Sequence, residues 1–537
     1  MRRALTICAL AGLALASPAA GQDQPRSGGE LVFMLPAADP PSYDGHREDT
    51  FAVLHPAAPH YSTLLRVDPT DRTASRIVGD LAESWSVSAD RRTYTLRLRR
   101  GVRFHDGSEL TTRDVKATYE KIMNPPAGVV SARKGEYAHV EALETPDAHT
   151  VVFRLKWPAG SFLSSLASPW NWIYKADILA RDVHWYEKNI MGTGPFTFVE
   201  HVKGAYWIGR KNPGYWDTGK PYLDGFRMLI VREPAAQVAA IRGERAHVQF
   251  RGFTPGERDT LVQALGPKVT VQEGPWDCHA LLAFNHEKKP FDDRRFRRAL
   301  TLAIDRREGS RVLSRIAIVK EVAGLMVPVS PWATPPAELE KLAGYGRDIN
   351  AARAEARRLL REAGVADGFA FTLTATGVRQ PFEALAIWLI DQWRAVGLAV
   401  TQDVPERARY YEKLRGGDYQ VTFDPKCGYI VEPDLDLQKF QSGPTTADPT
   451  GISQANYARY KDPVLDELYV KQSRARTPEE RTRYLREFER RLFDEEAHYA
   501  TTLQWNRIVP HASRVRGWTL TPSHYLNHQL DTVWLSE

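Results

Sequence analysis

The second half of the chain repeats one local pattern, an amphipathic helix followed by a glycine and a short apolar strand, and this limits the fold more than any other feature. A helix is predicted over residues 350–364, where alanines and leucines share one face and the final glycine suits the helix end. An apolar strand follows at 369–374. A second helix, 382–396, leads through another glycine into a strand at 398–401. This alternation is typical of mixed α/β layers.

The preceding segment, residues 81–155, has the period of half-exposed strands. Apolar residues alternate with polar ones over 94–99 and again over 151–155, which predicts antiparallel strands with one solvated face. Between them, residues 112–123 have helical spacing. A further strong helix is predicted at 481–496, where leucines and phenylalanines point inward.

The N-terminal residues differ chemically from the rest. Two arginines precede an apolar run over residues 5–16, which is too short to span a bilayer because a spanning helix needs about 20 residues. Small residues offer cleavage sites after Ala16 or Ala19. We predict a signal peptide at 1–19, general secretion and a periplasmic location. No lipid-attachment motif lies at the cleavage region, so a freely soluble exported protein is expected.

Charge and motifs exclude several classes of function. The formal net charge of +6 becomes +4 when the two arginines of the signal peptide are removed, and no long basic block occurs, so no nucleic-acid partner is expected. The chain lacks His-Glu-x-x-His, paired Cys-x-x-Cys, Gly-x-Ser-x-Gly and phosphate-loop motifs. We therefore expect no catalytic residue, no metal ligand and no cofactor.

Two cysteines, Cys278 and Cys427, follow the predicted signal peptide. In an oxidising compartment the pair could form a disulfide, or both could be buried free thiols. Their spacing leaves both possibilities open.

Three long motifs occur in order along the chain. The first comprises Asp-Leu-Ala-Glu-Ser-Trp at 80–85 and Gly-Val-Arg-Phe-His-Asp-Gly at 101–107. The second begins with Gly-Thr-Gly-Pro-Phe at 192–196, and the third comprises Leu-Ala-Phe-Asn at 282–285 and Pro-Phe-Asp-Asp at 290–293. Together they resemble the bacterial extracellular solute-binding proteins of family 5, the peptide-, nickel- and opine-type binding proteins of ABC importers.

The resemblance implies an α/β, periplasmic-binding-protein-like fold with two α/β lobes joined by a hinge and an extra subdomain in the first lobe. We expect lobe I at 28–275 with the subdomain at about 66–190, lobe II at 276–498, and a return to lobe I at 499–537. The implied function is non-enzymatic. A monomer captures a peptide or peptide-like small solute in the cleft between the lobes and delivers it to the permease subunits in the membrane.

The segment 426–433, Lys-Cys-Gly-Tyr-Ile-Val-Glu-Pro, resembles the loop that holds the ligand's amine in peptide-binding members. In those proteins an aspartate pairs with the α-ammonium group. Here Tyr429 takes the place of that aspartate and Lys426 that of a tryptophan. Asp424 or Glu432 could supply the missing negative charge from nearby.

The remaining site candidates also rest on the resemblance. Arg379 resembles the arginine that pairs with the ligand's carboxylate in dipeptide-binding members, a role that suits a forked guanidinium. Arg379 and Lys426 together would favour an acid-bearing ligand. The resemblance implies a disulfide between Cys278 and Cys427. The segment after the first strand and the last crossing into lobe I are expected to line the cleft with Tyr43, Asp44, His46, Trp505 and Asn506.

Two alternatives stay open. Because Tyr429 weakens the usual amine anchor, the ligand could be a non-peptide solute such as an organic acid, an opine, a sugar or a nickel chelate. An exported hydrolase is the alternative of another class, and it would need a nucleophile and base that the sequence does not show.

Overall fold

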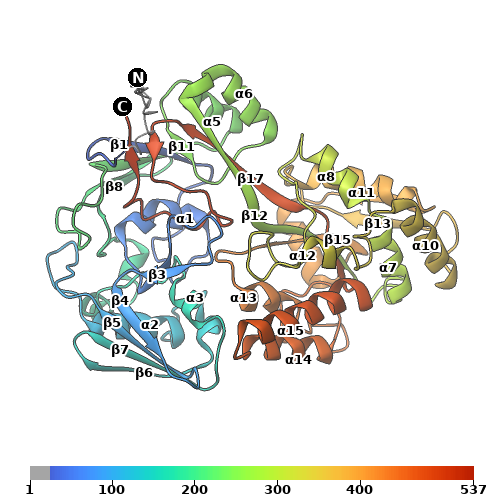
Figure 1. Ribbon diagram of the computed structural model, residues 1–537, viewed down its shortest axis with the longest axis horizontal. Coiled ribbons are helices and arrows are strands. Elements are labelled where there is room, and N and C mark those ends of the chain that lie inside the picture. The colour runs from blue at the N-terminus through green and yellow to red at the C-terminus, as the bar shows by residue number, and fades with distance from the viewer. Residues whose placement is uncertain (1–23) are drawn as a thin grey trace, which may run out of the picture.

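One long strand pair, β12 and β17, connects two bodies of the protein (Figure 1). The computed structural model describes residues 24–537, so the predicted signal peptide at 1–19 lies outside the described residues. β12 spans Val269–Phe284 and β17 spans Gln504–Ala512. The chain therefore crosses between the bodies once in each of these strands.

Eleven strands form one sheet that passes through both bodies, in the order β14-β13-β15-β12-β17-β11-β1-β10-β9-β8, with β16 beside β12. The first part of β12 pairs with β17, and the last part pairs with β15. The other strands of this sheet are β1 (Glu30–Leu35), β8 (Phe196–Val202), β9 (Tyr206–Lys211), β10 (Gly225–Ile230), β11 (Val248–Gln249), β13 (Ala370–Thr374), β14 (Ala399–Asp403), β15 (Val421–Cys427) and β16 (Tyr499–Ala500). We call the body with β1 and β8–β11 the first lobe and the body with β13–β15 the second lobe.

A second, four-stranded antiparallel sheet belongs to the first lobe and has the order β4-β5-β7-β6. The predicted period-two alternation is confirmed, because Tyr94, Leu96 and Leu98 are buried. The predicted helix is confirmed as well, and it starts where Thr111 and Asp114 form a capping box. The elements are β4 (Ala82–Val87), β5 (Thr93–Leu98), α2 (Thr112–Met123), β6 (Val140–Asp147) and β7 (Thr150–Leu155).

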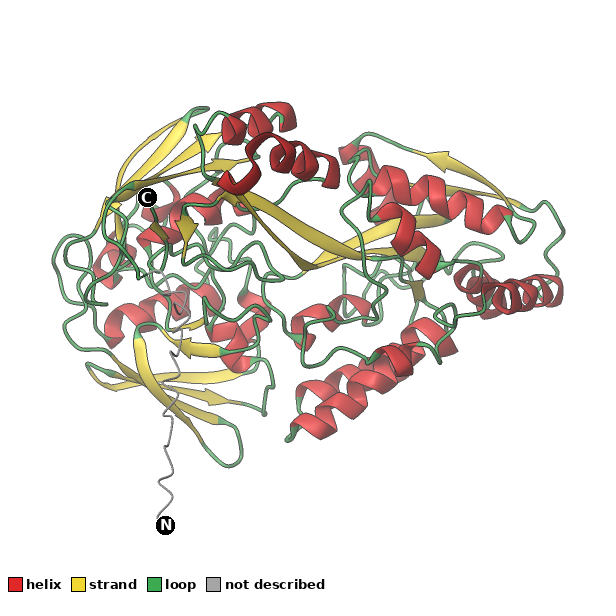
Figure 2. Cartoon of the chain, turned by 45° about the horizontal axis from the view of Figure 1, so that its top comes forward, coloured by secondary structure: helices red, strands yellow, loops and turns green. Residues whose placement is uncertain are grey.

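Helices pack around the strands of the second lobe (Figure 2), which confirms the predicted mixed α/β layers. The observed helix differs at both ends from the one predicted at 481–496. It begins at Pro478, because the Thr477 hydroxyl caps the Glu480 N–H, and its last turn, Arg491–Glu495, widens to π geometry. The helices are α7 (Arg294–Leu302), α8 (Arg306–Leu313), α9 (Pro336–Leu339), α10 (Ile349–Glu362), α11 (Phe382–Arg394), α12 (Arg407–Gly416), α13 (Pro433–Leu437), α14 (Pro463–Ser473) and α15 (Pro478–Arg490).

Shorter elements complete the first lobe. They are α1 (Phe51–Ala57), α3 (Phe162–Leu166), α4 (Ala176–Arg181), α5 (Pro234–Arg242), α6 (Pro255–Leu265), β2 (Leu65–Val67), β3 (Ile77–Gly79), β18 (Val515–Arg516) and β19 (Trp534–Leu535). Within residues 24–537, no helix combines the length and apolar character needed to cross a membrane.

The two lobes also touch away from the strand pair. The Gly160 N–H of the first lobe donates to the Ser473 carbonyl of the second over 2.8 Å. One apolar cluster includes Phe162 from the first lobe together with Leu437 and Leu485 from the second. The structure therefore holds the lobes in contact, and residues between them are candidates for contact with a ligand.

Candidate ligand-binding site

The crossing strands place aromatic side chains between the lobes. Trp505, at the start of β17, packs edge-to-face against Trp276 and also packs against Phe382, with both pairs of ring centroids 5.7 Å apart. Asn506 follows, and its backbone N–H donates to the Ile318 carbonyl over 2.8 Å. Trp505 and Asn506 lie at the crossing as predicted, but both are nearly enclosed, with exposed fractions of 5% and 6%.

Cys278 and Cys427 form a disulfide between neighbouring strands. β12 and β15 are antiparallel with these two residues opposite each other. This is the pairing that the resemblance implied. The disulfide fixes the start of the Tyr429 loop to the strand that crosses between the lobes.

Lys426 does not offer its charge to an acidic ligand, contrary to expectation. The buried Lys426 ammonium contacts the Asp436 carboxylate and lies 3.9 Å from Asp277 Oδ1. Both carboxylates are almost wholly buried. Burial and the nearby Asp277 together raise the pKa of Asp436 to about 8, against the opposing effect of Lys426. The lysine is thus enclosed beside two acids, Asp436 of the nearby helix α13 and Asp277 of β12.

Asp424 and Glu432 do not replace the missing aspartate either. Asp424 accepts hydrogen bonds from Lys439 Nζ at 2.6 Å and from the Tyr499 hydroxyl at 3.0 Å. Glu432 is ion-paired with Arg481. Burial raises the pKa of both carboxyls, and the lysine and arginine oppose this rise. Their charges are already compensated inside the second lobe.

Tyr429 connects the two lobes through a hydrogen bond. Its hydroxyl donates to Glu136 Oε2 over 2.5 Å, and Glu136 lies in the short 3-10 turn Lys134–Tyr137 of the first lobe. Burial raises the pKa of Glu136 to about 7, although the bond from Tyr429 and the charge of Arg133 lower it. The residue at the aspartate's position therefore makes a direct contact between the two lobes.

The candidates after the first strand lie inside the first lobe, which corrects the prediction that they line the cleft. Asp44 is buried and forms an ion pair of 2.6 Å with Lys121. His46 is also buried and donates to the Trp172 carbonyl over 2.9 Å. Burial lowers the pKa of His46 to about 3, so the ring is neutral. These polar groups are already satisfied by the protein.

Tyr43 and Arg379 are less enclosed. The Tyr43 hydroxyl forms a hydrogen bond of 2.8 Å with His201 Nδ1 of β8. Arg379 precedes α11, its side chain is 86% exposed, and its Nε lies 3.1 Å from Glu383 Oε2. The arginine expected to bind a carboxylate is thus paired with an acid of the neighbouring helix turn.

Two other arginines, which the sequence did not distinguish, are Arg251 in the first lobe and Arg407 in the second. Arg251 follows β11, and its guanidinium carbon is 5.2 Å from the Phe51 ring centroid and 5.4 Å from that of Trp276. Arg407 is the first residue of α12 in the second lobe and is exposed. Burial lowers the pKa of Arg251, the nearby Tyr525 opposes this effect, and the charge of Arg407 adds a smaller lowering. Each is one of many scattered arginines, and neither lies in a family-like motif.

The described residues offer no candidate metal-binding site. Within residues 24–537, no three histidine, cysteine, aspartate or glutamate side chains are grouped so as to hold a metal ion.

Comparison with known proteins is consistent with these features. The family model for "Bacterial extracellular solute-binding proteins, family 5 Middle" matches residues 76–448, more than half of the chain. Di/tripeptide-binding protein 2 of Pseudomonas aeruginosa is 27% identical over 543 residues, which cover 95% of each chain.

Solved structures share the fold. The periplasmic binding protein DppA of Helicobacter pylori, in complex with the peptide STSA, has a TM-score of 0.75 at 24% identity and covers 95% of this chain and 99% of its own. The binding protein AgaA from A.tumefacien R10, in complex with agropinic acid, has a TM-score of 0.73 at 22% identity with the same coverage. The fold predicted from the motifs is confirmed. The chain belongs to the bacterial extracellular solute-binding proteins, family 5, and is a substrate-binding protein of an ABC transporter, not an enzyme.

Proposed function

We propose that this protein captures a peptide or peptide-like small solute between its lobes and delivers it to the permease subunits of an importer. The observation that supports this most is the similarity to a di/tripeptide-binding protein along 95% of both chains. The proposal includes export to the periplasm by the signal peptide at 1–19 and action as a monomer.

The lobe arrangement supports a capture mechanism. We propose lobe boundaries at 28–275, 276–498 and 499–537, with the subdomain at about 66–190, so that β12 and β17 form the hinge. A ligand that contacts both lobes stabilises their closed arrangement, and only the difference in contact free energy between open and closed states drives closure. The bond from Tyr429 to Glu136 is one contact that would form on closure. The permease would then distinguish closed from open receptors.

A non-peptide acid is the second candidate ligand, and one observation favours it. The position of the usual aspartate is Tyr429, while Asp424 and Glu432 are already paired with basic side chains. None of these three positions supplies a free carboxylate for an α-ammonium group. Agropinic acid, which occupies the structurally similar AgaA, represents this alternative. The exported hydrolase is no longer a candidate, because the family consists of solute-binding proteins.

Mass spectrometry of small molecules released from the denatured, purified protein tests the proposal. A thermal-shift screen with dipeptides, tripeptides and organic acids then measures stabilisation, which reaches about 2.7 kcal/mol at a ligand concentration of 100 times Kd. We expect at least one peptide to raise the midpoint of unfolding. No bound peptide and no shift with any peptide, together with a shift by an organic acid, would contradict the peptide assignment and favour the second candidate.

A further inference from the structure

A cavity of about 440 Å³ opens on the first lobe, away from the contacts between the lobes. It is lined by the end of α5 and the loop to β11, the end of α6, the segment after β17 and the C-terminus. In Figure 1 these segments lie at the top of the view, at the opposite end of the first lobe from the four-stranded sheet. The volume lies in the range of small-molecule sites.

One wall of this cavity is a buried histidine whose tautomer is fixed. His247 is 4% exposed, and its Nδ1 accepts a hydrogen bond from the Val32 N–H over 2.9 Å. Burial, aided by the charge of Arg514, lowers the pKa of His247 to about 4, so the ring is neutral at pH 7. A neutral ring that accepts at Nδ1 carries its proton on Nε2. The Nε2 atom is therefore a hydrogen-bond donor.

The group that meets this donor is a second donor. Arg514 Nη2 contacts His247 Nε2, and a guanidinium has no acceptor atom. Within residues 24–537, the two acids of the lining form ion pairs with other cations, Glu244 with Lys268 at 2.7 Å and Glu537 with Arg26 at 2.6 Å. Two donors in contact need an acceptor beside both of them. An anion in the cavity would supply its oxygens to both groups.

The rest of the lining combines apolar surface with positive charge. Ile241 of α5, Leu265 of α6 and Pro267 contribute apolar side chains, and Arg516 adds a further cation. Apolar walls bury the body of a ligand, while a few polar groups fix its orientation. Inorganic phosphate would leave the apolar wall uncovered. The lining therefore favours an acid group attached to a hydrocarbon body.

We propose that this cavity is a second ligand site, separate from the cleft between the lobes, for a small organic anion with an apolar body. The acid group accepts hydrogen bonds from His247 Nε2 and from the Arg514 guanidinium, and the body packs against Ile241 and Leu265. Hydrogen bonds between a guanidinium and an ionised acid are among the stronger ones in proteins. The site does not depend on the proposed capture function.

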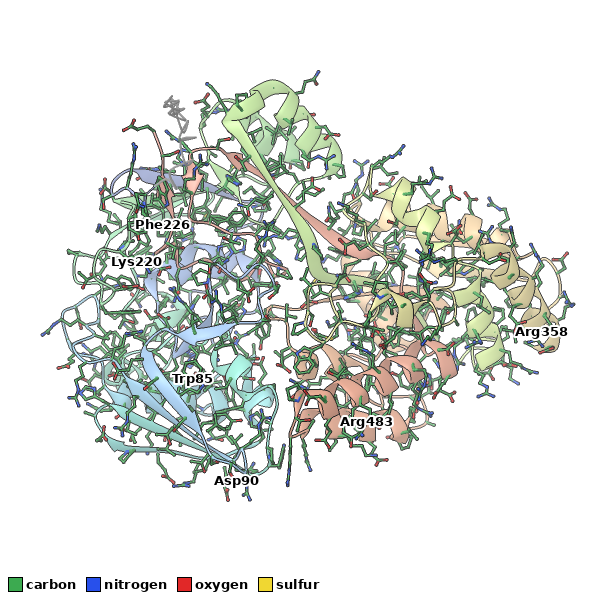
Figure 3. The ribbon with its side chains drawn as sticks, viewed as in Figure 1. Trp85, Asp90, Lys220, Phe226, Arg358 and Arg483 are labelled. Atoms are coloured by element: carbon green, nitrogen blue, oxygen red, sulfur yellow. A yellow bond between two sulfur atoms is a disulfide. The ribbon has the colours of Figure 1, made fainter. Side chains whose placement is uncertain are left out.

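A fluorescent organic anion, 8-anilinonaphthalene-1-sulfonate, tests the site. It is titrated into the wild type, Arg514→Ala, Arg514→Lys and the control Arg358→Ala. Arg358 lies at the outer end of the second lobe (Figure 3), where it is ion-paired with Glu355 and Glu362. We expect one saturable site in the wild type, binding about tenfold weaker or more in Arg514→Ala, as for loss of a charge-assisted hydrogen bond, an intermediate loss in Arg514→Lys, and no change in Arg358→Ala.

Displacement of the probe separates the contribution of charge from that of apolar contact. Octanoate should displace it, whereas the neutral octanamide at the same concentration should not. Equal displacement by both, or unchanged affinity in Arg514→Ala, would overturn the site. Inorganic phosphate that displaces the probe as well as octanoate does would overturn the organic-anion class. Displacement by the dipeptide Met-Leu would place the probe in the cleft and also count against the site, while any of these failures leaves peptide capture intact.

Discussion

Replacing Glu136 by glutamine should remove a pH dependence of ligand binding. In the structure, the Glu136 carboxyl of the first lobe accepts a hydrogen bond from the Tyr429 hydroxyl of the second lobe, and burial raises its pKa to about 7. When the lobes separate, water reaches this carboxyl and its pKa should return to the ordinary value of 4.5. The closed form therefore holds a proton that the open form releases between these two pH values.

The sign and size of the effect follow from this difference. Closure takes up a proton between pH 4.5 and pH 7, so closure becomes less favourable as pH rises through that window and changes no further above it. A shift of 2.5 pKa units corresponds to at most about 3.4 kcal/mol. Because ligand binds the closed form, apparent affinity should fall by roughly 50- to 100-fold between pH 5 and pH 8. Glu136→Gln keeps an acceptor for Tyr429 but has no proton to lose.

Calorimetric titrations of one ligand at pH 5, 6, 7 and 8 check this prediction. Using the same ligand for both proteins cancels the ligand's own titration. The affinity of Glu136→Gln should vary less with pH than that of the wild type, and it should exceed the wild-type affinity at pH 8. Tyr429→Phe, which removes the hydroxyl donor but keeps the carboxyl, should not flatten the dependence. Identical pH profiles for the wild type and Glu136→Gln would refute the reasoning.

Three further predictions concern stability. Lys121→Met should lower the free energy of unfolding by about 3–5 kcal/mol in urea titrations, because the buried Asp44 carboxylate loses its partner. Adding Asp44→Asn should restore most of this stability, and failure to restore it would contradict the role of the ion pair. Replacing Cys278 and Cys427 together by serine should cost about 5 kcal/mol by the chain-entropy relation for a sequence separation of 149 residues, and a calorimetric change below about 1 kcal/mol would disagree. Gly428→Ala should lower the unfolding midpoint, since its Cβ would lie 2.1 Å from Asp277 Oδ2; an unchanged midpoint would oppose this.

Patterns of local origin were predictable from the sequence. The alternation at 94–99 depends on which side chains face water along one strand, and it produced β5 as expected. The helix at 112–123 depends on its own spacing and cap. The helix predicted at 481–496 was misplaced at its ends because the Thr477 cap and the wide final turn are features of backbone geometry.

The charged candidates were less predictable because their partners are distant in sequence. Lys426 seemed available for an acid, but the antiparallel register of β12 and β15 places His279 opposite it and brings Asp277 within 3.9 Å. Asp44 meets Lys121 only because the first lobe folds the helix α2 against the segment after β1. The residues that neighbour Lys426 and Asp44 in the sequence give no indication that Asp277 and Lys121 are their partners.

The sequence by itself indicated the class of protein: its apolar periodicities predicted mixed α/β layers, and the resemblance of its ordered motifs to family 5 implied a two-lobed solute receptor. Only the tertiary structure decided which charges are already paired and which stay free. Coulomb interactions depend on distance and on exclusion of water, and both are set by packing between segments that are far apart in the chain. For this reason Lys426, Asp424 and Glu432 are already paired within the protein, although nothing in the sequence indicated it.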